Sequence, residues 1–425
     1  MLSIFWGSIQ LIGIGVICIF EYKKKSAAVF LWGTLFIMFG IMHFMTTIVG
    51  SDMYQRQVID DASYFVCLFC SIYILVRITL SSLISLNYDA DSIYSPKEDS
   101  LYRFFLIMFV IVLIVKMITF IVYSGGIMNA SWLLMREFST LNSNILFAIS
   151  TRLFFVFSTI LLLALMKRNR KHIWLISILL IFNMALFKNR IEITPIIVSP
   201  FIYLMCYKKV KLSPRNVSIF ILSVLFFLYV VYFIRAVRWY GSLDSILQEA
   251  TLADINERVL FFLKTDDGEL GLRNGFYYFI SKDNNFPGFG EGATYLRLLL
   301  IAIPTDLSFG LKPEDFALTM GMSAGMEAGG SMHPTLFGDC YANFGFIGWL
   351  LGGVWAGIVS ILDKITSSLG SLYQSSFVCL LGIGYIMIAR GAVYSGYYCI
   401  FFGLIIIILL RFIFMLNIKK IRLHL

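Results

Sequence analysis

Apolar runs close to the length of a membrane span recur from one end of this 425-residue chain to the other. A helix needs about 20 apolar residues to cross the hydrocarbon core of a bilayer. In lipid every backbone N–H and C=O needs a partner within the protein. Runs of this length meet that need as helices, because the strands of a membrane barrel are about half as long and alternate in polarity. The sequence therefore predicts an all-α integral membrane protein.

The composition excludes other classes of protein. Hydrophobic residues make up 59% of the chain and charged residues 14%, against roughly 25% charged residues in an ordinary soluble domain. The net charge of +9 would suit a nucleic-acid partner, but the Lys and Arg residues are concentrated in short connectors between the apolar runs. That pattern is typical of membrane orientation, so we expect a membrane lipid environment and no nucleic acid.

The apolar pattern predicts eleven spans. They cover residues 2–20, 26–49, 62–83, 102–123, 144–166, 173–187, 191–207, 216–234, 345–362, 375–392 and 398–416. The two short runs on either side of residues 188–190 could form two spans or one broken hairpin.

The distribution of basic residues predicts the orientation. With the C-terminal tail in the cytoplasm, the tail and the three connectors EYKKK, KRNRKH and KKVKLSPR lie on one side and hold fourteen of the 34 Lys and Arg residues. The short connectors on the opposite side hold only four, namely Arg56, Arg136, Lys188 and Arg190. Because cytoplasmic loops carry the excess of Lys and Arg, this asymmetry predicts the sidedness of every span.

One connector, residues 235–344, is far longer than the others and lies outside in this topology. It carries fourteen acidic and eight basic residues, with many aromatic, Leu and Ile residues that argue against disorder. We expect it to fold against the membrane helices. The predicted organisation is one integral domain in three segments, with spans in 1–234, a large periplasmic loop in 235–344, and spans plus a cytoplasmic tail in 345–425.

Ionisable residues inside spans usually face the protein interior or water, where they mark a pathway or a site. Snorkelling towards the cytoplasmic surface explains Arg77, Arg103 and Arg411 without a function. The outer half of the bundle holds a second basic set, with Glu192 as the only acid clearly inside the spans. This set comprises Lys116, Arg152, Lys188, Arg190 and Arg390. Such a set would bind an anion of several charges, such as a lipid-linked pyrophosphate, or would pair with acids of the loop.

Three segments of the sequence carry a resemblance to a known family. The first is the turn FKNRIEITP around Arg190, and the second runs from Tyr295 and Arg297 through Ile303-Pro304 to Lys312-Pro313. The third is the glycine-rich segment GMEAGGSMHPTLFGDCYANFGFIG. Together with the number of spans and the single large outer loop, they resemble the Wzy-type polymerases of O-antigen repeat units, which are related to the O-antigen ligases.

The resemblance implies a GT-C-like glycosyltransferase of the bacterial inner membrane that needs no metal or other cofactor. Its donor and acceptor would be undecaprenyl-pyrophosphate-linked oligosaccharides, joined at the periplasmic face during lipopolysaccharide biosynthesis, with a chain-length regulator protein as a further partner. Such a reaction needs cations for the departing pyrophosphate and a base for the acceptor hydroxyl. The candidate bases are Glu327 and His333. The candidate substrate-binding residues are Lys116, Arg152, Lys188, Arg190, Arg297, Lys312, Tyr341, Asn343 and Arg390.

Each candidate also has a structural interpretation. Glu327 could be an exposed loop acid, and His333 before Pro334 could be a turn residue. Asn343 could cap the following helix, which is the commoner role of Asn at that position. At the level of function, the alternatives are an O-antigen ligase, in which a His precedes a Gly-x-x-Gly segment, and a flippase for the same lipid-linked substrates. His333 precedes Gly345-Phe-Ile-Gly348, but its neighbour is Pro334 where the ligases carry a polar residue.

Overall fold

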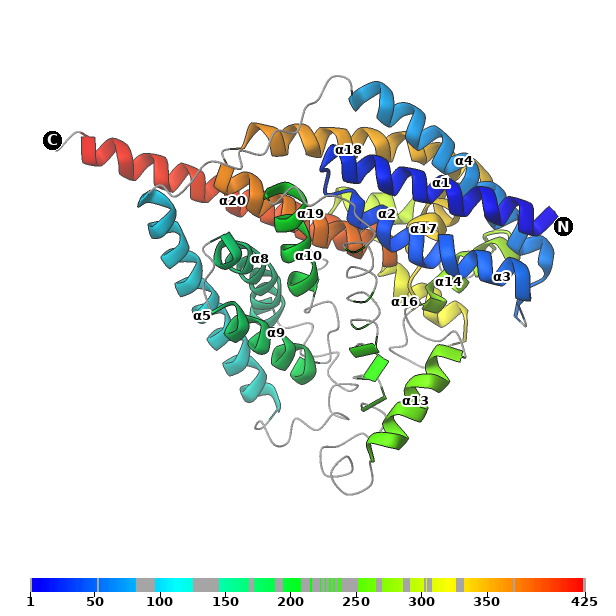
Figure 1. Cartoon of the computed structure of the whole chain (residues 1–425), viewed down its shortest axis with the longest axis horizontal. Helices are drawn as coiled ribbons and strands as arrows, with labels where there is room; N and C mark the ends of the chain where they lie inside the picture. Colours follow the sequence, from blue (N-terminus) through cyan, green and yellow to red (C-terminus); the bar gives the residue numbers. More distant parts are fainter. Residues whose placement is uncertain are drawn as a thin grey trace. The chain divides into compact units, whose positions relative to one another are not determined.

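The computed structural model describes residues 2–51, 53–81, 96–124, 145–167, 172–187, 194–207, 251–264, 270–285, 291–301, 303, 308–325, 332–369 and 371–422, with isolated residues between 215 and 237. All regular structure in these ranges is helical (Figure 1). Contacts divide the chain into two units, with Met1–Tyr88 and Glu269–Leu425 in unit 1 and Asp89–Gly268 in unit 2. The second boundary falls inside the predicted outer loop, so most of that loop belongs to unit 1.

Unit 1 contains the first and last helices of the chain. Its elements are α1 (Leu2–Lys24), α2 (Val29–Leu35), the π-helical η1 (Phe36–Met42), α3 (His43–Val49), α4 (Arg56–Ser81), η4 (Leu270–Leu272), α14 (Arg273–Ser281), α15 (Ala293–Leu299), α16 (Phe316–Ser323), α17 (Thr335–Phe344), η6 (Gly345–Leu350), α18 (Leu351–Ser368), α19 (Ser371–Arg390) and α20 (Val393–Arg422). The described elements of unit 2 are α5 (Pro96–Ser124), α8 (Ile145–Lys167), α9 (Ile173–Phe187), α10 (Thr194–Ile202), η3 (Tyr203–Tyr207) and α13 (Leu252–Lys264).

Seven helices in the described residues are long and apolar enough to cross a membrane. They cover residues 3–24, 29–49, 56–80, 102–122, 149–166, 335–368 and 393–412, and shorter apolar helices cover 173–183, 194–206 and 376–390. Ten of the eleven predicted spans therefore coincide with an apolar helix. The remaining one, 216–234, lies almost entirely outside the described residues. This is the architecture of an all-α, multi-pass membrane protein.

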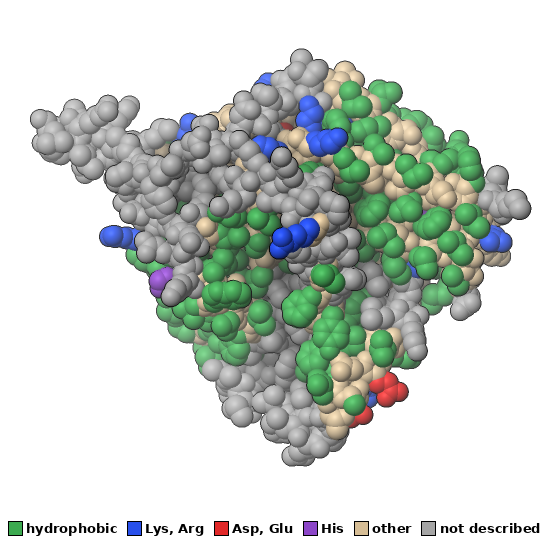
Figure 2. Space-filling view, viewed as in Figure 1, with side chains coloured by type: hydrophobic (Ala, Val, Ile, Leu, Met, Phe, Trp, Pro, Cys, Tyr) green, Lys and Arg blue, Asp and Glu red, His purple; other side chains and the backbone are tan. Residues whose placement is uncertain are grey.

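The surface of α1 shows why lipid is the solvent of these helices. One stripe of α1 is exposed and apolar, and it consists of Phe5, Ile12, Val16 and Ile19. These residues recur at helical spacing, whereas Ile14 and Ile17 face the interior and are buried. Figure 2 shows hydrophobic and uncharged side chains over most of the face formed by the N-terminal helices. A soluble protein rarely exposes such a large apolar surface.

The loop helices α14 and α17 join unit 1 through an aromatic core. Phe276 of α14 and Phe337 of α17 pack on Phe39 of η1 with ring centroids 5.8 and 4.9 Å apart. On α4, Phe65 lies 5.4 Å from Phe276 and Phe69 lies 5.1 Å from Phe337. Edge-on contacts of this kind stabilise beyond the area that they bury. The described loop residues therefore fold onto the helices of unit 1.

Helices α19 and α20 cross at two glycines. A Cβ atom built on Gly396 would lie 2.2 Å from the carbonyl oxygen of Gly384, and one built on Gly384 would lie 2.5 Å from Ile400 Cγ1. Lipid tails are as apolar as Leu side chains, so helices in a membrane associate through close packing at small residues. The backbone contact at this crossing depends on the absence of side chains.

A buried charge cluster joins α1, α4 and α18, which run side by side in Figure 1. The Arg77 guanidinium donates to both carboxylate oxygens of Glu21, over 2.9 Å from Nε and 2.9 Å from Nη2. Nη2 also donates to Asp363, and Nη1 donates to Ser360 Oγ over 2.9 Å. All three charged side chains are nearly inaccessible to solvent. We call Glu21, Arg77 and Asp363 the charge cluster.

The charge cluster corrects two expectations from the sequence. Snorkelling is wrong for Arg77, because its guanidinium points into the protein and is held by two carboxylates. Glu192 lies outside the described residues, and two acids that the sequence placed just beyond the spans lie within helices, namely Glu21 on α1 and Asp363 on α18. The apolar runs end at residues 20 and 362, but both helices continue past these ends. Two carboxylates that accept the hydrogen bonds of this guanidinium offset part of the cost of burying it, so the side chain does not need to reach the surface.

We expect Gly396→Ala to destabilise the protein. The added Cβ would overlap the backbone of α19, and overpacking of this kind costs about 1–3 kcal/mol or more. Gly357→Ala on α18 is the matched control, because a Cβ there meets no atom within 4 Å. Thermal unfolding of the purified protein in detergent should show a lower Tm for Gly396→Ala only. An unchanged Tm would contradict the crossing geometry.

We expect Arg77→Met to destabilise the protein by about 3–5 kcal/mol, because it leaves two carboxylates buried without their cation. Adding Glu21→Gln and Asp363→Asn to the same chain should restore part of the loss by removing those charges. Arg103→Met on α5 is the control, since Arg103 is exposed. The measurement is again Tm in detergent. Equal effects of Arg77→Met and Arg103→Met would contradict the role of the cluster.

Candidate functional site

The loop helices of unit 1 converge on the short turn between α19 and α20. Helix α19 ends at Arg390 and α20 begins at Val393, so only two residues connect them. The sequence placed the start of the last span five residues further on. Segments from α15, α16 and α17 contact this turn or the first residues of α20. We call the turn and the loop residues that contact it the turn site.

Asp339 of α17 is the anchor of the turn site. Its side chain is completely buried, and its Oδ2 accepts the backbone N–H of Val393 over 2.8 Å. That N–H belongs to the first turn of α20, where the helix has no internal acceptor and carries a partial positive charge. Oδ1 accepts the Asn343 Nδ2 amide over 2.7 Å. One carboxylate thus fastens the start of α20 to the loop.

Asn343 extends this network to α15. Its Nδ2 also donates to Thr294 Oγ1 over 3.1 Å, and its Oδ1 accepts the Thr294 backbone N–H over 3.2 Å. The side chain is buried. The expectation that Asn343 caps the following helix is therefore wrong, because the residue lies inside α17 and uses its amide to hold a neighbouring helix.

His333, two residues before the start of α17, also lies against the turn. Its Nδ1 is 3.9 Å from the position that a Cβ on Gly391 would occupy, and Gly391 directly follows Arg390. Its carbonyl oxygen is 2.6 Å from a Cβ built on Gly275, so α14 accommodates this backbone only because residue 275 is glycine. The next helix begins at Thr335, a β-branched residue with a φ of 64°. Such left-handed strain persists only where the surrounding structure holds it, and it is common at functional sites.

Arg390 occupies the last turn of α19 and is half-buried. A cation at this end of a helix is favoured by the partial negative charge of the last carbonyl groups. The turn site therefore brings together two of the residues predicted from sequence, since His333 packs on the residue next to Arg390.

Two other predicted cations hold the loop together. The Arg297 guanidinium lies 5.0 Å from the centre of the Tyr394 ring, donates to the Pro313 carbonyl and is 3.8 Å from Asp315 Oδ2. The Tyr394 hydroxyl in turn accepts the Phe316 N–H over 2.9 Å, which joins α16 to the start of α20. Lys312 Nζ donates to the Ile303 carbonyl over 2.7 Å. Both cations therefore bond within the loop or to α20.

Two tyrosines complete the interior of the site. The Tyr341 ring packs 5.5 Å from Phe65 and 5.9 Å from Phe276, and its carbonyl accepts Asn284 Nδ2 over 2.7 Å. Tyr295 of α15 places its hydroxyl 3.6 Å from Cys340 Sγ. Burial raises the pKa of Tyr295 well above its usual range, so this hydroxyl remains protonated.

The remaining predicted residues lie elsewhere. Lys116 of unit 2 is completely buried, donates to Asn183 Oδ1 over 3.1 Å and places Nζ 4.9 Å from the centre of the Phe154 ring. Its ammonium is thus satisfied by an amide and an aromatic face, not presented outward. Arg152 lies on α8, but its side chain is outside the described part. Lys188, Arg190 and Glu327 also lie outside the described residues.

Asp339 was not among the site residues predicted from the sequence. The spacing of two polar residues in the sequence could have indicated its anchoring role. Asp339 and Asn343 are four residues apart in a largely apolar helix and therefore share one face. Two polar side chains on one face of a buried helix imply partners on another element. The identity of those partners, Val393 and Thr294, could not be read from the pattern.

The turn site has the components of proton transfer and anion binding. An imidazole can take a proton from a hydroxyl, and a guanidinium can stabilise a leaving group that gains negative charge. Within the described residues, no group of three or more His, Cys, Asp or Glu side chains could hold a metal ion.

Comparison with known proteins does not identify a family for this chain. No family model, no curated protein and no solved structure matches this chain.

We expect Asp339→Ala to destabilise the turn site by about 1–3 kcal/mol for each buried donor that it leaves without a partner. The affected donors are the Val393 N–H and the Asn343 amide. Hydrogen exchange of the first turn of α20 should accelerate in this variant. Glu314→Ala is the matched control from the same loop, since Glu314 is exposed. Unchanged exchange in Asp339→Ala would contradict the anchoring role.

Proposed function

We propose that this protein polymerises undecaprenyl-pyrophosphate-linked oligosaccharide repeat units into O-antigen or a related surface polysaccharide. The reaction would be a metal-independent glycosyl transfer at the periplasmic face of the bacterial inner membrane. In this proposal the protein has about eleven spans in a GT-C-like arrangement, and its loop 235–344 lies in the periplasm. It is supported by the resemblance of the three sequence segments and by the multi-pass helical architecture.

The single observation that carries the proposal is the packing of His333 on the turn that follows Arg390. The two residues come from different sequence segments and supply a candidate base and a candidate cation. In the predicted topology the turn lies on the outer side, where lipid-linked oligosaccharides are joined in such pathways. A site with these two groups suits transfer to a hydroxyl with departure of an anion.

The proposed step moves the growing glycan from one carrier to another. The acceptor hydroxyl of the new repeat unit loses its proton to Glu327 or His333, and its oxygen forms a bond to the anomeric carbon of the growing chain. The bond between that carbon and the pyrophosphate oxygen breaks, and undecaprenyl pyrophosphate leaves with the electron pair. Arg390 would stabilise the charge on the leaving group, and the resemblance implies the same role for Lys188 and Arg190.

The contacts of the other candidates suggest supporting roles. Arg297, Lys312, Tyr341 and Asn343 hold the loop helices to one another and to α20. In this proposal they position the groups that touch substrate. A reaction centre needs such a frame, because small misplacements of the reacting groups cost large factors in rate.

One observation favours the flippase alternative. Ionisable residues inside a membrane often mark a transport pathway, and the charge cluster lies between three helices. However, Arg77 is bonded to both acids, and Tyr73 and Ser26 also donate to them. A fully hydrogen-bonded cluster of this kind is equally suited to joining helices. The ligase alternative shares the lipid-linked donor and differs only in the acceptor.

Deletion of the gene distinguishes the three functions, with surface glycan analysed on a gel. A polymerase predicts loss of the ladder with one repeat unit retained. Full-length glycan accumulating on the lipid carrier would indicate a ligase. Absence of any unit at the surface would indicate a flippase, and either of these last results would overturn the proposal.

In the deletion strain, we expect plasmid-borne Arg390→Ala, Arg190→Ala, Glu327→Ala and His333→Ala to reduce chain extension. Loss of one charged or proton-accepting group typically costs about a hundredfold or more in rate. The ladder should shorten or vanish while single units remain. Glu314→Ala is the control and should restore the full ladder. Wild-type ladders from all four variants, at equal protein levels, would contradict the assignment of the site.

A further inference from the structure

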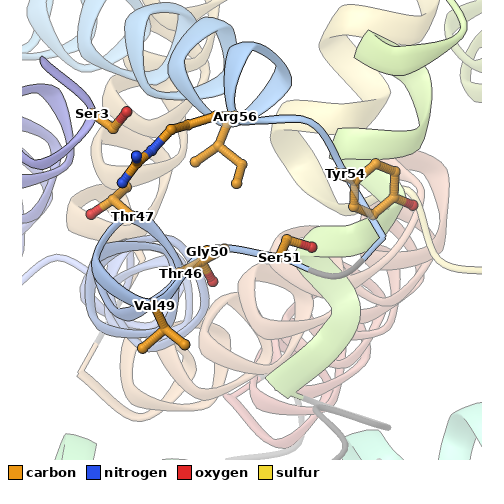
Figure 3. A pocket seen from close by; sticks show the side chains of 9 residues that line it. Ser3, Thr46, Thr47, Val49, Gly50, Ser51, Tyr54 and Arg56 are labelled. Atoms are coloured by element: carbon orange, nitrogen blue, oxygen red, sulfur yellow. The ribbon is translucent and has the colours of Figure 1, made fainter.

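A pocket of about 220 Å³ lies apart from the turn site, where α1 begins, α3 ends and α4 begins. Figure 3 shows the side chains that line it. They are Ser3, Thr46, Thr47, Val49, Ser51, Tyr54, Arg56 and Ile59, with Gly50 at the end of α3. The first residues of α4 lie on one side of the pocket and the end of α3 lies on the other. In the predicted topology this end of the three helices faces outward.

The lining combines one cation with several hydroxyl groups. Arg56 is exposed and is the only charged residue among those that line the pocket. It forms no ion pair with any residue that the structure describes. Figure 3 shows its guanidinium on the side of Thr47 and Ser3. A guanidinium in a hydroxyl-lined pocket is suited to an oxyanion such as a phosphate, which it can bind through two parallel hydrogen bonds.

The walls of the pocket are held in place by the loop helix α14. Arg273 donates to Thr46 Oγ1 over 3.0 Å from Nη2, and the Tyr54 hydroxyl donates to the Asn274 carbonyl over 3.1 Å. The Tyr54 ring also packs 5.5 Å from Tyr277, whose hydroxyl is 2.5 Å from the buried His43 ring. Contacts within the protein therefore hold two sides of the pocket in place.

The surroundings of the pocket are apolar and exposed. Val49 lines the pocket and is 80% exposed, and Met53 beside it is 77% exposed. Phe5, Met45 and Ile48 are also exposed near the same ends of α1 and α3. A free anion would gain nothing from these side chains, whereas a lipid tail would cover them. The polar pocket with an apolar border therefore matches an amphiphile with an anionic head.

We propose that this pocket binds the phosphate group of a membrane lipid, with Arg56 as its main contact and the lipid tail along the exposed side chains of α1 and α3. Two sources have this chemistry, namely a glycerophospholipid such as phosphatidylglycerol and a polyprenyl phosphate. The site is separate from the turn site and does not depend on glycan polymerisation.

The test measures lipid binding by the full chain, purified in a maltoside detergent, from the rise in Tm with ligand concentration. Four probes are compared: phosphatidylglycerol, undecaprenyl phosphate, diacylglycerol and inorganic phosphate. At least one phosphate-headed lipid should raise Tm, and the stronger of the two identifies the source. Diacylglycerol lacks the phosphate and inorganic phosphate lacks the tail, so both should bind much more weakly.

The variants Arg56→Gln and Arg56→Lys identify the site. Arg56→Gln loses a charge-assisted hydrogen bond to the phosphate, so it should raise the Kd of the phosphate-headed lipid roughly tenfold. Arg56→Lys keeps the charge without the two-pronged contact and should give a smaller loss. Arg103→Gln is the matched control, since Arg103 is another exposed arginine near the start of a span, and it should leave the Kd unchanged.

Three results would overturn the proposal: an unchanged Kd in Arg56→Gln, diacylglycerol binding as tightly as the phosphate-headed lipids, or inorganic phosphate binding as tightly as they do. Because the assay involves no glycan synthesis, its failure would leave the proposed polymerase activity untouched. Loss of polymerisation in the turn-site variants would likewise leave lipid binding in this pocket intact.

Discussion

The pairing of Arg77 with Glu21 and Asp363 is the interaction on which the arrangement of unit 1 depends most. It joins α1, α4 and α18, and no water is available at a buried position to replace a lost partner. In lipid the apolar faces of helices gain little by leaving the solvent, because that solvent is itself apolar. Specific polar contacts and close backbone approaches must therefore fix which helices meet. The charge cluster supplies the first kind of contact, and the crossing of Gly384 and Gly396 supplies the second.

This frame determines where the loop can make a site. The turn between α19 and α20 is short, and the two helices pack closely at Gly384 and Gly396. The loop helices therefore pack against a turn whose position is fixed by this crossing. Asp339 fastens α17 to the start of α20 through the Val393 N–H. Arg297 and Tyr394 fasten α15 and α16 to the same helix. His333 lies next to Gly391 because its neighbours on α17 are fastened to the start of α20.

Much of the fold could be predicted from the sequence, because the solvent sets the length of a span. Apolar runs located ten helices, with their ends misplaced by up to ten residues. Those ends mattered, since Glu21 and Asp363 lie just beyond the predicted boundaries on helices that continue past them. The site was predicted less well. His333 and Arg390 were singled out, but Asp339 received no role, and Arg297 and Asn343 proved to bond within the loop.

The sequence by itself determined that the chain is helical and where most of its apolar helices lie, and the side that each helix end faces stays a prediction from the Lys and Arg distribution. Hydrophobic length and the distribution of Lys and Arg are local properties, so a single chain is enough to state them. Only the tertiary structure decided the partners of the buried polar groups. Arg77 bonds to residues 56 and 286 positions away along the chain. Contacts at such separations follow from how helices pack, and no local pattern encodes them.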